Sequence, residues 1–239
     1  MRLPVLTGTI KRRLLINFRA DPEVVGRILP ERVRPKLQNG FAVVGVCLIR
    51  LEHERPAGIP RMLGMSGEHA AHRFAVEWTN ENGHDTDGVF ISRRHTDSLA
   101  ARLAGGRVFP VESHAAHFDV RDVDGHIDFS MRSDDGKYTV EVEGDESNTF
   151  APNSCFDSLE QVSTFFEGGS VGYSATSGAD RLQGVELWTP EWKVGSFDVA
   201  NVHTSYFEDK SLFPDGSIEF DHALVMRNLE HEWRAAPDL

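Results

Sequence analysis

The amino-acid sequence predicts a mostly β fold, built as a large antiparallel sheet with a few short helices. Many segments alternate apolar and polar residues and are rich in Val, Ile, Phe and Thr, which is typical of strands. Turn dipeptides, mainly Asn-Gly and Asp-Gly, separate several of these segments and favour β-hairpins. The long helical crossovers that a parallel sheet requires are missing. A sheet of this size tends to curl into a barrel or a sandwich, and barrels often hold one small ligand.

The expected elements follow from these patterns in chain order. The expected strands cover residues 7–19, 41–51, 69–79, 88–94, 113–121, 126–132, 138–143, 185–187, 192–206 and 217–233. The expected short helices cover 22–29, which Asp21 caps, 97–104, and 158–166, which Asp157 or Ser158 caps. Residues 55–67, which contain Pro, Gly and Met, predict a loop. Because no linker, repeat or composition break is present, we expect one domain over 1–239.

Composition narrows the functional classes. The 239 residues carry a formal net charge of −12 at pH 7, so neither a nucleic acid nor an anionic membrane is an expected partner. No signal peptide and no apolar run of about 18 residues is present, and we expect a cytoplasmic protein. The two cysteines, Cys47 and Cys155, lack metal-type spacing, and Cys47 in its apolar run predicts a buried free thiol. Nucleotide-binding and serine-hydrolase motifs are absent, so no cofactor or metal is expected.

The densest polar cluster on a predicted strand comprises Glu68, His69, His72 and Arg73. Because alternate residues on a strand share a face, Glu68 and His72 face one way, and His69 and Arg73 face the other. One hypothesis places Glu68 and His72 in a cavity as acid and base. A metal site would need His69 and His72 on one face, which a regular strand does not allow. The alternative is a hydrogen-bonded surface strand.

Arginines and a tyrosine form the remaining candidates. Arg93, Arg94 and Arg107 flank a loop and short helix, and guanidinium groups bind carboxylate or phosphate through two parallel hydrogen bonds. They predict a pocket for an anionic small molecule, or else surface arginines that pair with the abundant acids. Tyr173 follows glycines that let a backbone approach a ligand closely. Its phenol either donates to a substrate oxygen or packs as a buried aromatic group.

Several stretches together resemble the YqjF-like family, domain of unknown function 2071. They are RRLLINFRADP at 12–22, GEHAAHR at 67–73, GVFISRR at 88–94, GSVGYS at 169–174 and EFDHALVMR at 219–227. That family is in turn similar to the acetoacetate decarboxylase superfamily. The resemblance implies a cone-like antiparallel β-barrel with a closed internal cavity.

The resemblance also bears on mechanism. Decarboxylases of the superfamily form a Schiff base on a lysine, whose pKa is lowered by a second lysine and by burial. The corresponding stretch here continues with Val111-Glu112 in place of two lysines, so Schiff-base chemistry is not expected. Lys11 lies near the position of a substrate-carboxylate arginine of the superfamily, and Glu68 matches its pocket glutamate.

Three functions are consistent with these observations. The first is a lyase-like enzyme without a Schiff base, acting on a small keto acid or another anionic carbonyl compound. Its candidate residues are Glu68, His72 and Tyr173 for proton transfer, and Lys11, Arg93, Arg94 and Arg107 for the substrate carboxylate. The second is a barrel that binds an anionic metabolite without chemistry, and the third is a structural barrel filled by aromatic side chains. Because the superfamily often assembles, a homo-oligomer is also considered.

Overall fold

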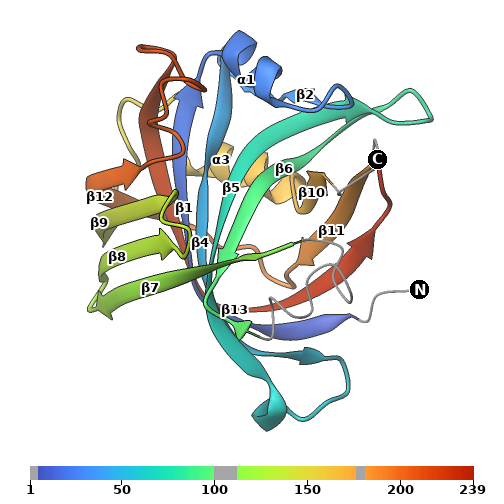
Figure 1. The fold of residues 1–239 in the computed structure, drawn as a ribbon, viewed down its shortest axis with the longest axis vertical. Coiled ribbons are helices and arrows are strands. Elements are labelled where there is room, and N and C mark those ends of the chain that lie inside the picture. Colours follow the sequence, from blue (N-terminus) through green and yellow to red (C-terminus); the bar gives the residue numbers. More distant parts are fainter. Residues whose placement is uncertain (1–4, 100–111, 176–180) are drawn as a thin grey trace.

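Thirteen strands dominate the computed structural model, which describes residues 5–99, 112–175 and 181–239 (Figure 1). The strands are β1 (Leu6–Ala20), β2 (Arg34–Pro35), β3 (Leu37–Gln38), β4 (Phe41–Pro56), β5 (Met65–Thr79), β6 (Asp85–Thr96), β7 (His114–Val123), β8 (His126–Ser133), β9 (Thr139–Ser147), β10 (Val171–Ala175), β11 (Leu182–Trp188), β12 (Gly195–Thr204) and β13 (Ile218–Ala236). The helices are α1 (Pro22–Ile28) and α3 (Leu159–Gly168), with a 3-10 turn η1 (Arg61–Leu63). None of the helices in the described residues is long and apolar enough to cross a membrane.

Local sequence explains the caps and turns. The Asp21 carboxylate accepts a hydrogen bond from the Glu23 amide at the start of α1, and the Ser158 hydroxyl accepts one from the Gln161 amide at the start of α3. The hairpin turn before β4 places Asn39 and Gly40 at φ 47° and 84°. Two left-handed residues in succession match the right-handed twist of the flanking strands, as expected for Asn-Gly.

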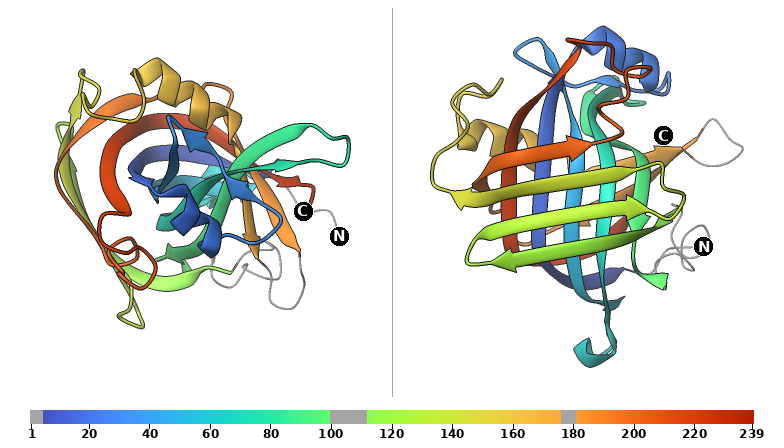
Figure 2. Two further views of the ribbon diagram at one scale, coloured as in Figure 1. Left: turned by 90° about the horizontal axis from the view of Figure 1, so that it is seen from above. Right: turned by 60° about the vertical axis from the view of Figure 1, so that its left-hand side comes forward.

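The strand pairings close into two rings that share β13, β1, β4, β5 and β6. One ring, which we call the seven-stranded ring, is completed by β10 and β11, because β6 pairs with β10, β10 with β11, and β11 with β13. The other, the nine-stranded ring, is completed by β7, β8, β9 and β12. Figure 2 shows these last four strands lying across the shared ones. The predicted mostly β, barrel-like fold is confirmed, with a shared wall that the sequence did not reveal.

Four expectations about the strands and their pairing are corrected. Residues 55–67 are not a loop throughout, because β4 and β5 extend the hairpin to Pro56 and from Met65, beyond the buried core. The sheet is not purely antiparallel, since the β6–β7 and β6–β10 pairings are short parallel contacts. The strand expected from residue 192 begins at Gly195, and β10 was not expected at all because its sequence is rich in glycine and serine. The helix expected over 97–104 lies mostly outside the described residues.

The shared strands present different side chains to the two rings. On β1, Leu14, Ile16 and Phe18 belong to the aromatic-rich core of the nine-stranded ring. Leu15 belongs instead to a second apolar cluster, which α3 joins through Val162 and Phe166. Because successive strand residues point to opposite faces, adjacent residues of a shared strand place their side chains in the interiors of different rings.

Candidate functional site

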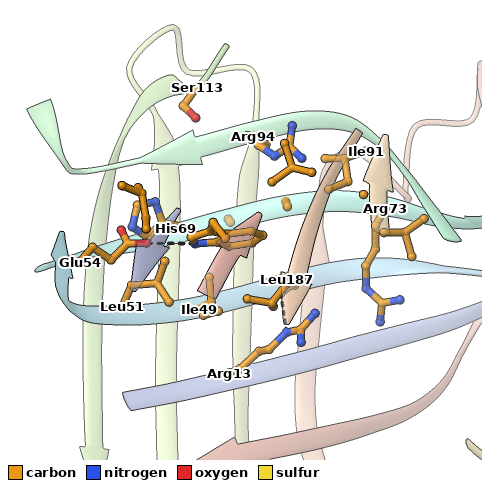
Figure 3. Close-up of a pocket in the computed structure, with 18 of the residues that line it drawn as sticks. Arg13, Ile49, Leu51, Glu54, His69, Arg73, Ile91, Arg94, Ser113 and Leu187 are labelled. Atoms are coloured by element: carbon orange, nitrogen blue, oxygen red, sulfur yellow. Dashed lines mark hydrogen bonds between the residues drawn. The ribbon is translucent and has the colours of Figure 1, made fainter. Parts of the chain in front are cut away.

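The strands of the seven-stranded ring line a partly open cavity of about 260 Å³ (Figure 3). All seven strands contribute to its lining, and Phe166 of α3 reaches it as well. Most of the wall is apolar, and the larger apolar side chains are Ile49, Leu51, Ile91, Leu187, Trp192 and Trp233. An apolar enclosure with a few polar groups is the usual form of a small-molecule site.

The described lining contains four arginines. Arg55 donates to the backbone carbonyls of Ile59 and His53 in the hairpin beyond the core, and the other three, Arg13, Arg73 and Arg94, stand on neighbouring rows of the sheet. Arg13 donates to the Cys47 sulfur, Nε to Sγ at 3.3 Å, and Arg94 donates from Nη1 to the Ser174 hydroxyl at 2.7 Å. Arg73 donates from Nη2 to the Asn17 side-chain oxygen and lies over the Phe166 ring at 4.5 Å. Within the described part of the chain, none of the three forms an ion pair with a carboxylate. We call this set the arginine triad.

Cross-strand register places the triad around Cys47. One row of paired residues across the sheet runs Leu15, Cys47, Ala71 and Arg94. The flanking rows contribute Arg13, which pairs with Ile49, and Arg73, which pairs with Gly45. Rows two residues apart on a sheet lie within reach of long side chains. The small Ala71 and Gly45 leave room for the guanidinium groups beside the cysteine.

Burial lowers the pKa values of two arginines of the triad. Desolvation lowers the pKa of Arg73 to about 10; the Cys47 sulfur opposes this shift, and the positive charge of Arg13 adds to it. Desolvation likewise lowers the pKa of Arg94 to about 10, again opposed by Cys47. Both guanidinium groups therefore stay charged at neutral pH, in surroundings that disfavour the charge. Such a site is poised to accept an anion.

The carboxylate that the described lining contains, Glu54, does not neutralise the triad. Its Oε1 accepts a hydrogen bond from the Trp233 indole at 3.0 Å. It lies toward the end of the cavity where His69 and Ser113 also contribute to the wall (Figure 3). The Nε2 atom of His69 has no hydrogen-bond partner there. The described lining thus carries more positive than negative groups.

The three residues predicted for proton transfer lie elsewhere. Glu68 accepts a buried hydrogen bond from Arg12 at 2.6 Å, on the face of β5 opposite to His69. Burial raises the pKa of the Glu68 carboxyl, and Arg12 opposes the shift. Tyr173 packs edge-on against Trp78 at 5.1 Å between ring centroids. Neither residue lines the cavity, so their acid–base roles stay predictions that do not apply to this site.

His72 lies inside the nine-stranded ring among aromatic side chains. Its ring is 4.7 Å from that of Tyr206 and 5.9 Å from that of His95 between centroids. In the described part of the chain, neither of its nitrogens has a hydrogen-bond partner. Burial lowers the pKa of His72 to about 3, and the neighbouring His95 and Arg93 lower it further in the same direction. The imidazole is therefore neutral, and it does not line the cavity.

Of the residues predicted to bind a carboxylate, Arg94 lines the cavity. Arg93 points to the opposite face and lies over the Tyr138 ring at 4.5 Å. Lys11 is exposed and donates to the Asn228 side chain at 3.0 Å, so a cavity-facing role for it is wrong. Arg107 lies outside the described residues.

Sequence reasoning missed Arg13, Arg73 and Cys47. All three belong to strands that the sequence predicts. Arg73 was named in the polar cluster and Cys47 as a buried free thiol, but neither was assigned to a ligand site. The missing information was which face of each strand points into the seven-stranded ring. The alternation was visible, but a choice between the two faces needs the ring closure made by β10 and β11.

The chemistry available at the cavity is limited by its lining. None of the five lysines lines it: four are exposed, and Lys36 is ion-paired with Asp87. A Schiff base on lysine therefore has no amine here. Among the described residues, no group of three His, Cys, Asp or Glu side chains is placed to hold a metal ion. The cavity offers cation-based anion recognition and one thiol.

Comparison with known proteins agrees with this architecture. MppR, an enduracididine biosynthesis enzyme complexed with pyruvate, is 11% identical with a TM-score of 0.59, and the match covers 100% of this chain and 90% of that one. Acetoacetate decarboxylase from Legionella pneumophila is 15% identical with a TM-score of 0.55, covering 97% and 87%. An acetoacetate decarboxylase-like enzyme from Sphingomonas wittichii RW1 is 12% identical with a TM-score of 0.58, covering 98% and 92%. At these identities the likeness shows the fold.

Sequence comparison supplies the family. No curated protein matches the chain. The model of DUF2071, described as an uncharacterized conserved protein, matches residues 7–225, which is nearly the whole chain. The predicted family membership is confirmed: the chain belongs to the DUF2071 family, and it has the acetoacetate decarboxylase-like fold.

Proposed function

We propose that this protein binds a small carboxylate in the cavity of the seven-stranded ring, and that its ligand class is a 2-oxo acid about the size of pyruvate. The observation that carries the proposal is the arginine triad. Arg13, Arg73 and Arg94 face one cavity, and none of them is ion-paired within the described residues.

Energetics favour an anionic occupant. A buried charge without a counter-charge costs free energy that an ion partner offsets. Arg73 is 3% exposed, and its Nε has no hydrogen-bond partner among the residues that the structure describes. A ligand carboxylate accepts charge-assisted hydrogen bonds from such groups, and guanidinium presents two parallel donors to it.

Size and wall chemistry narrow the ligand. The cavity of about 260 Å³ exceeds the roughly 150 Å³ that accommodates benzene, so a compact molecule fits. Apolar walls next to the triad favour a ligand whose body is uncharged. A carboxylate with a carbonyl or short alkyl body meets both conditions.

A neighbour in fold supports the class. The MppR structures contain pyruvate in one case and the condensation product of pyruvate and imidazole 4-carboxaldehyde in another. These ligands belong to that protein. They support a 2-oxo acid as the ligand class here because the two proteins share the fold.

Thermal-shift titration with pyruvate tests the proposal with two adjacent arginines. Pyruvate raises the Tm of the wild-type protein by mass action. Arg94→Met lowers the affinity about tenfold or more, because one charge-assisted contact is lost. Arg93→Met, whose side chain lies on the other face, keeps the wild-type affinity. Equal losses in both variants, or no Tm rise with pyruvate and other small carboxylates, would refute the proposal.

A further inference from the structure

Cys47 is the free cysteine that lines the cavity. It lies on β4 in the middle row of the wall, is 8% exposed, and accepts a hydrogen bond from Arg13 at 3.3 Å. Its charge interaction with Arg73 and Arg94 opposes the effect of burial on both of them. Electropositive surroundings of this kind are typical of reactive cysteines.

Independent observations point to a ligand beside this thiol. His69 lines the cavity on the same face of β5 as Arg73, and among the described residues its buried Nε2 atom has no hydrogen-bond partner. The Nε of Arg73 is likewise buried without a partner. Buried polar groups in folded proteins normally find partners, so these atoms indicate an occupant of the cavity.

We propose that Cys47 adds covalently and reversibly to the carbonyl carbon of a 2-oxo carboxylate held by the arginine triad; this inference rests on the proposed function. Arg13 contacts the attacking sulfur, while the remaining guanidinium groups are available for the carboxylate. Cys47 thus takes the place of the amine nucleophile that the lining lacks.

The addition is balanced without any co-reactant. The sulfur, as thiolate, forms a bond to C2 of the 2-oxo acid, and the carbonyl π electrons move to the oxygen. That oxygen takes up the proton released by the thiol, which yields a thiohemiketal. Nothing is oxidised or reduced, and the reverse steps release the unchanged acid.

Alkylation with a charged and an uncharged reagent tests the thiol and its surroundings. In both reactions the sulfur displaces iodide from carbon. Iodoacetate carries a carboxylate and iodoacetamide does not, so the triad accelerates iodoacetate at Cys47 about tenfold relative to iodoacetamide. Peptide mass spectrometry measures the extent of alkylation of Cys47 and of Cys155 in the same sample. Cys155 does not line the cavity, and burial raises its pKa to about 12, with Asp221 adding to the shift, so it reacts slowly with both reagents.

Variants make the alkylation result specific. Arg94→Met removes one of the guanidinium groups available for the reagent carboxylate and reduces the preference for iodoacetate at Cys47, whereas Arg93→Met leaves the preference unchanged. Pyruvate slows the labelling of Cys47 by competition. An unreactive Cys47, or one that reacts equally with both reagents, would overturn the inference.

NMR with pyruvate labelled with carbon-13 at C2 separates this inference from the proposed function. The expected result is conversion of part of the carbonyl resonance to that of a tetrahedral carbon in the wild-type protein and no conversion in Cys47→Ala. If pyruvate raises the Tm of both proteins while C2 stays a carbonyl, the covalent step is wrong and binding stands. If pyruvate stabilises neither protein and C2 is unchanged, both proposals fail.

Discussion

The seven-stranded and nine-stranded rings share five strands, but they accommodate buried charge differently. On the nine-stranded side, the buried Arg12 is paired with Glu68 at 2.6 Å and with Asp122 at 3.6 Å. On the seven-stranded side, Arg13, the next residue of β1, lines the cavity and donates to the sulfur atoms of Cys47 and Met226, with no carboxylate partner among the described residues. Two neighbouring arginines thus differ: Arg12 faces an interior where carboxylates balance its charge, and Arg13 faces one where no described carboxylate does.

This difference separates structural from ligand-binding polarity. A buried ion pair is complete, and its members have no need of a further partner. Buried arginines without a carboxylate leave part of their interaction potential unused, and a ligand can supply it. The packed interior holds the large aromatic side chains Phe74, Phe129, Phe207 and Phe213, whereas the arginine-lined interior is hollow.

The largest expected effect is a difference in the free energy of unfolding between variants of Arg12 and Arg13. Arg12→Met leaves Glu68 buried without its cation and lowers the free energy of unfolding by about 3–5 kcal/mol. Arg13→Met removes an arginine that has no ion partner, so its free energy of unfolding stays near the wild-type value or rises. Urea unfolding of both variants measures the difference. Equal destabilisation would show that the two interiors do not treat charge differently.

The second prediction concerns the packed interior at acid pH. Burial lowers the pKa of His72 to about 3, whereas an unfolded imidazole titrates near 6.5. The unfolded state therefore binds a proton first as the pH falls. The contribution of His72 to the free energy of unfolding is therefore fully present above about pH 6.5, where the imidazole is neutral in both states. It is lost progressively as the pH falls toward about 3. The free energy of unfolding declines by about 1.4 kcal/mol per pH unit for this histidine.

Replacement of this histidine checks the slope. His72→Phe suits the aromatic surroundings and cannot titrate, so the dependence of the free energy of unfolding on pH between about 6 and 4 becomes shallower. The slope is the readout, because it is insensitive to any packing cost of the larger ring. His95, whose pKa burial lowers to about 4, with Arg93 and His114 contributing, continues to titrate in the variant. An unchanged slope in His72→Phe would contradict the assignment.

The smallest expected effect concerns the volume of the cavity in the seven-stranded ring. A Cβ added at Gly172 would lie 3.0 Å from Cδ1 of Ile91 and 3.7 Å from Nη2 of Arg94. Gly172→Ala therefore narrows the cavity next to the triad, and we expect about a tenfold loss of pyruvate affinity. Gly26→Ala on α1 is the control, because its Cβ would meet nothing within 4 Å. Isothermal titration of both variants measures the effect, and unaltered affinity in Gly172→Ala would place the ligand elsewhere.

The predictable part of the fold was carried by local patterns. The Asp21-Pro22 start of α1, the Ser158 cap of α3 and the Asn39-Gly40 hairpin depend on contacts between residues close in the chain. The missed strand β10 pairs with β6 and β11, and its glycine and serine content gives no alternating pattern. Arg94 is the predicted carboxylate-binding residue that lines the cavity, and its role as a ligand contact stays a prediction.

By itself, the sequence determined which segments become strands and which residues of each strand share a face, because alternation is a local property of the extended backbone. Glu68 and His72 were thus grouped correctly, as were His69 and Arg73. Only the tertiary structure decided which face encloses a cavity. That choice depends on β13 pairing with both β1 and β11, which joins residues far apart in the chain. A one-residue step along each strand separates the paired charges of one interior from the free arginines of the other.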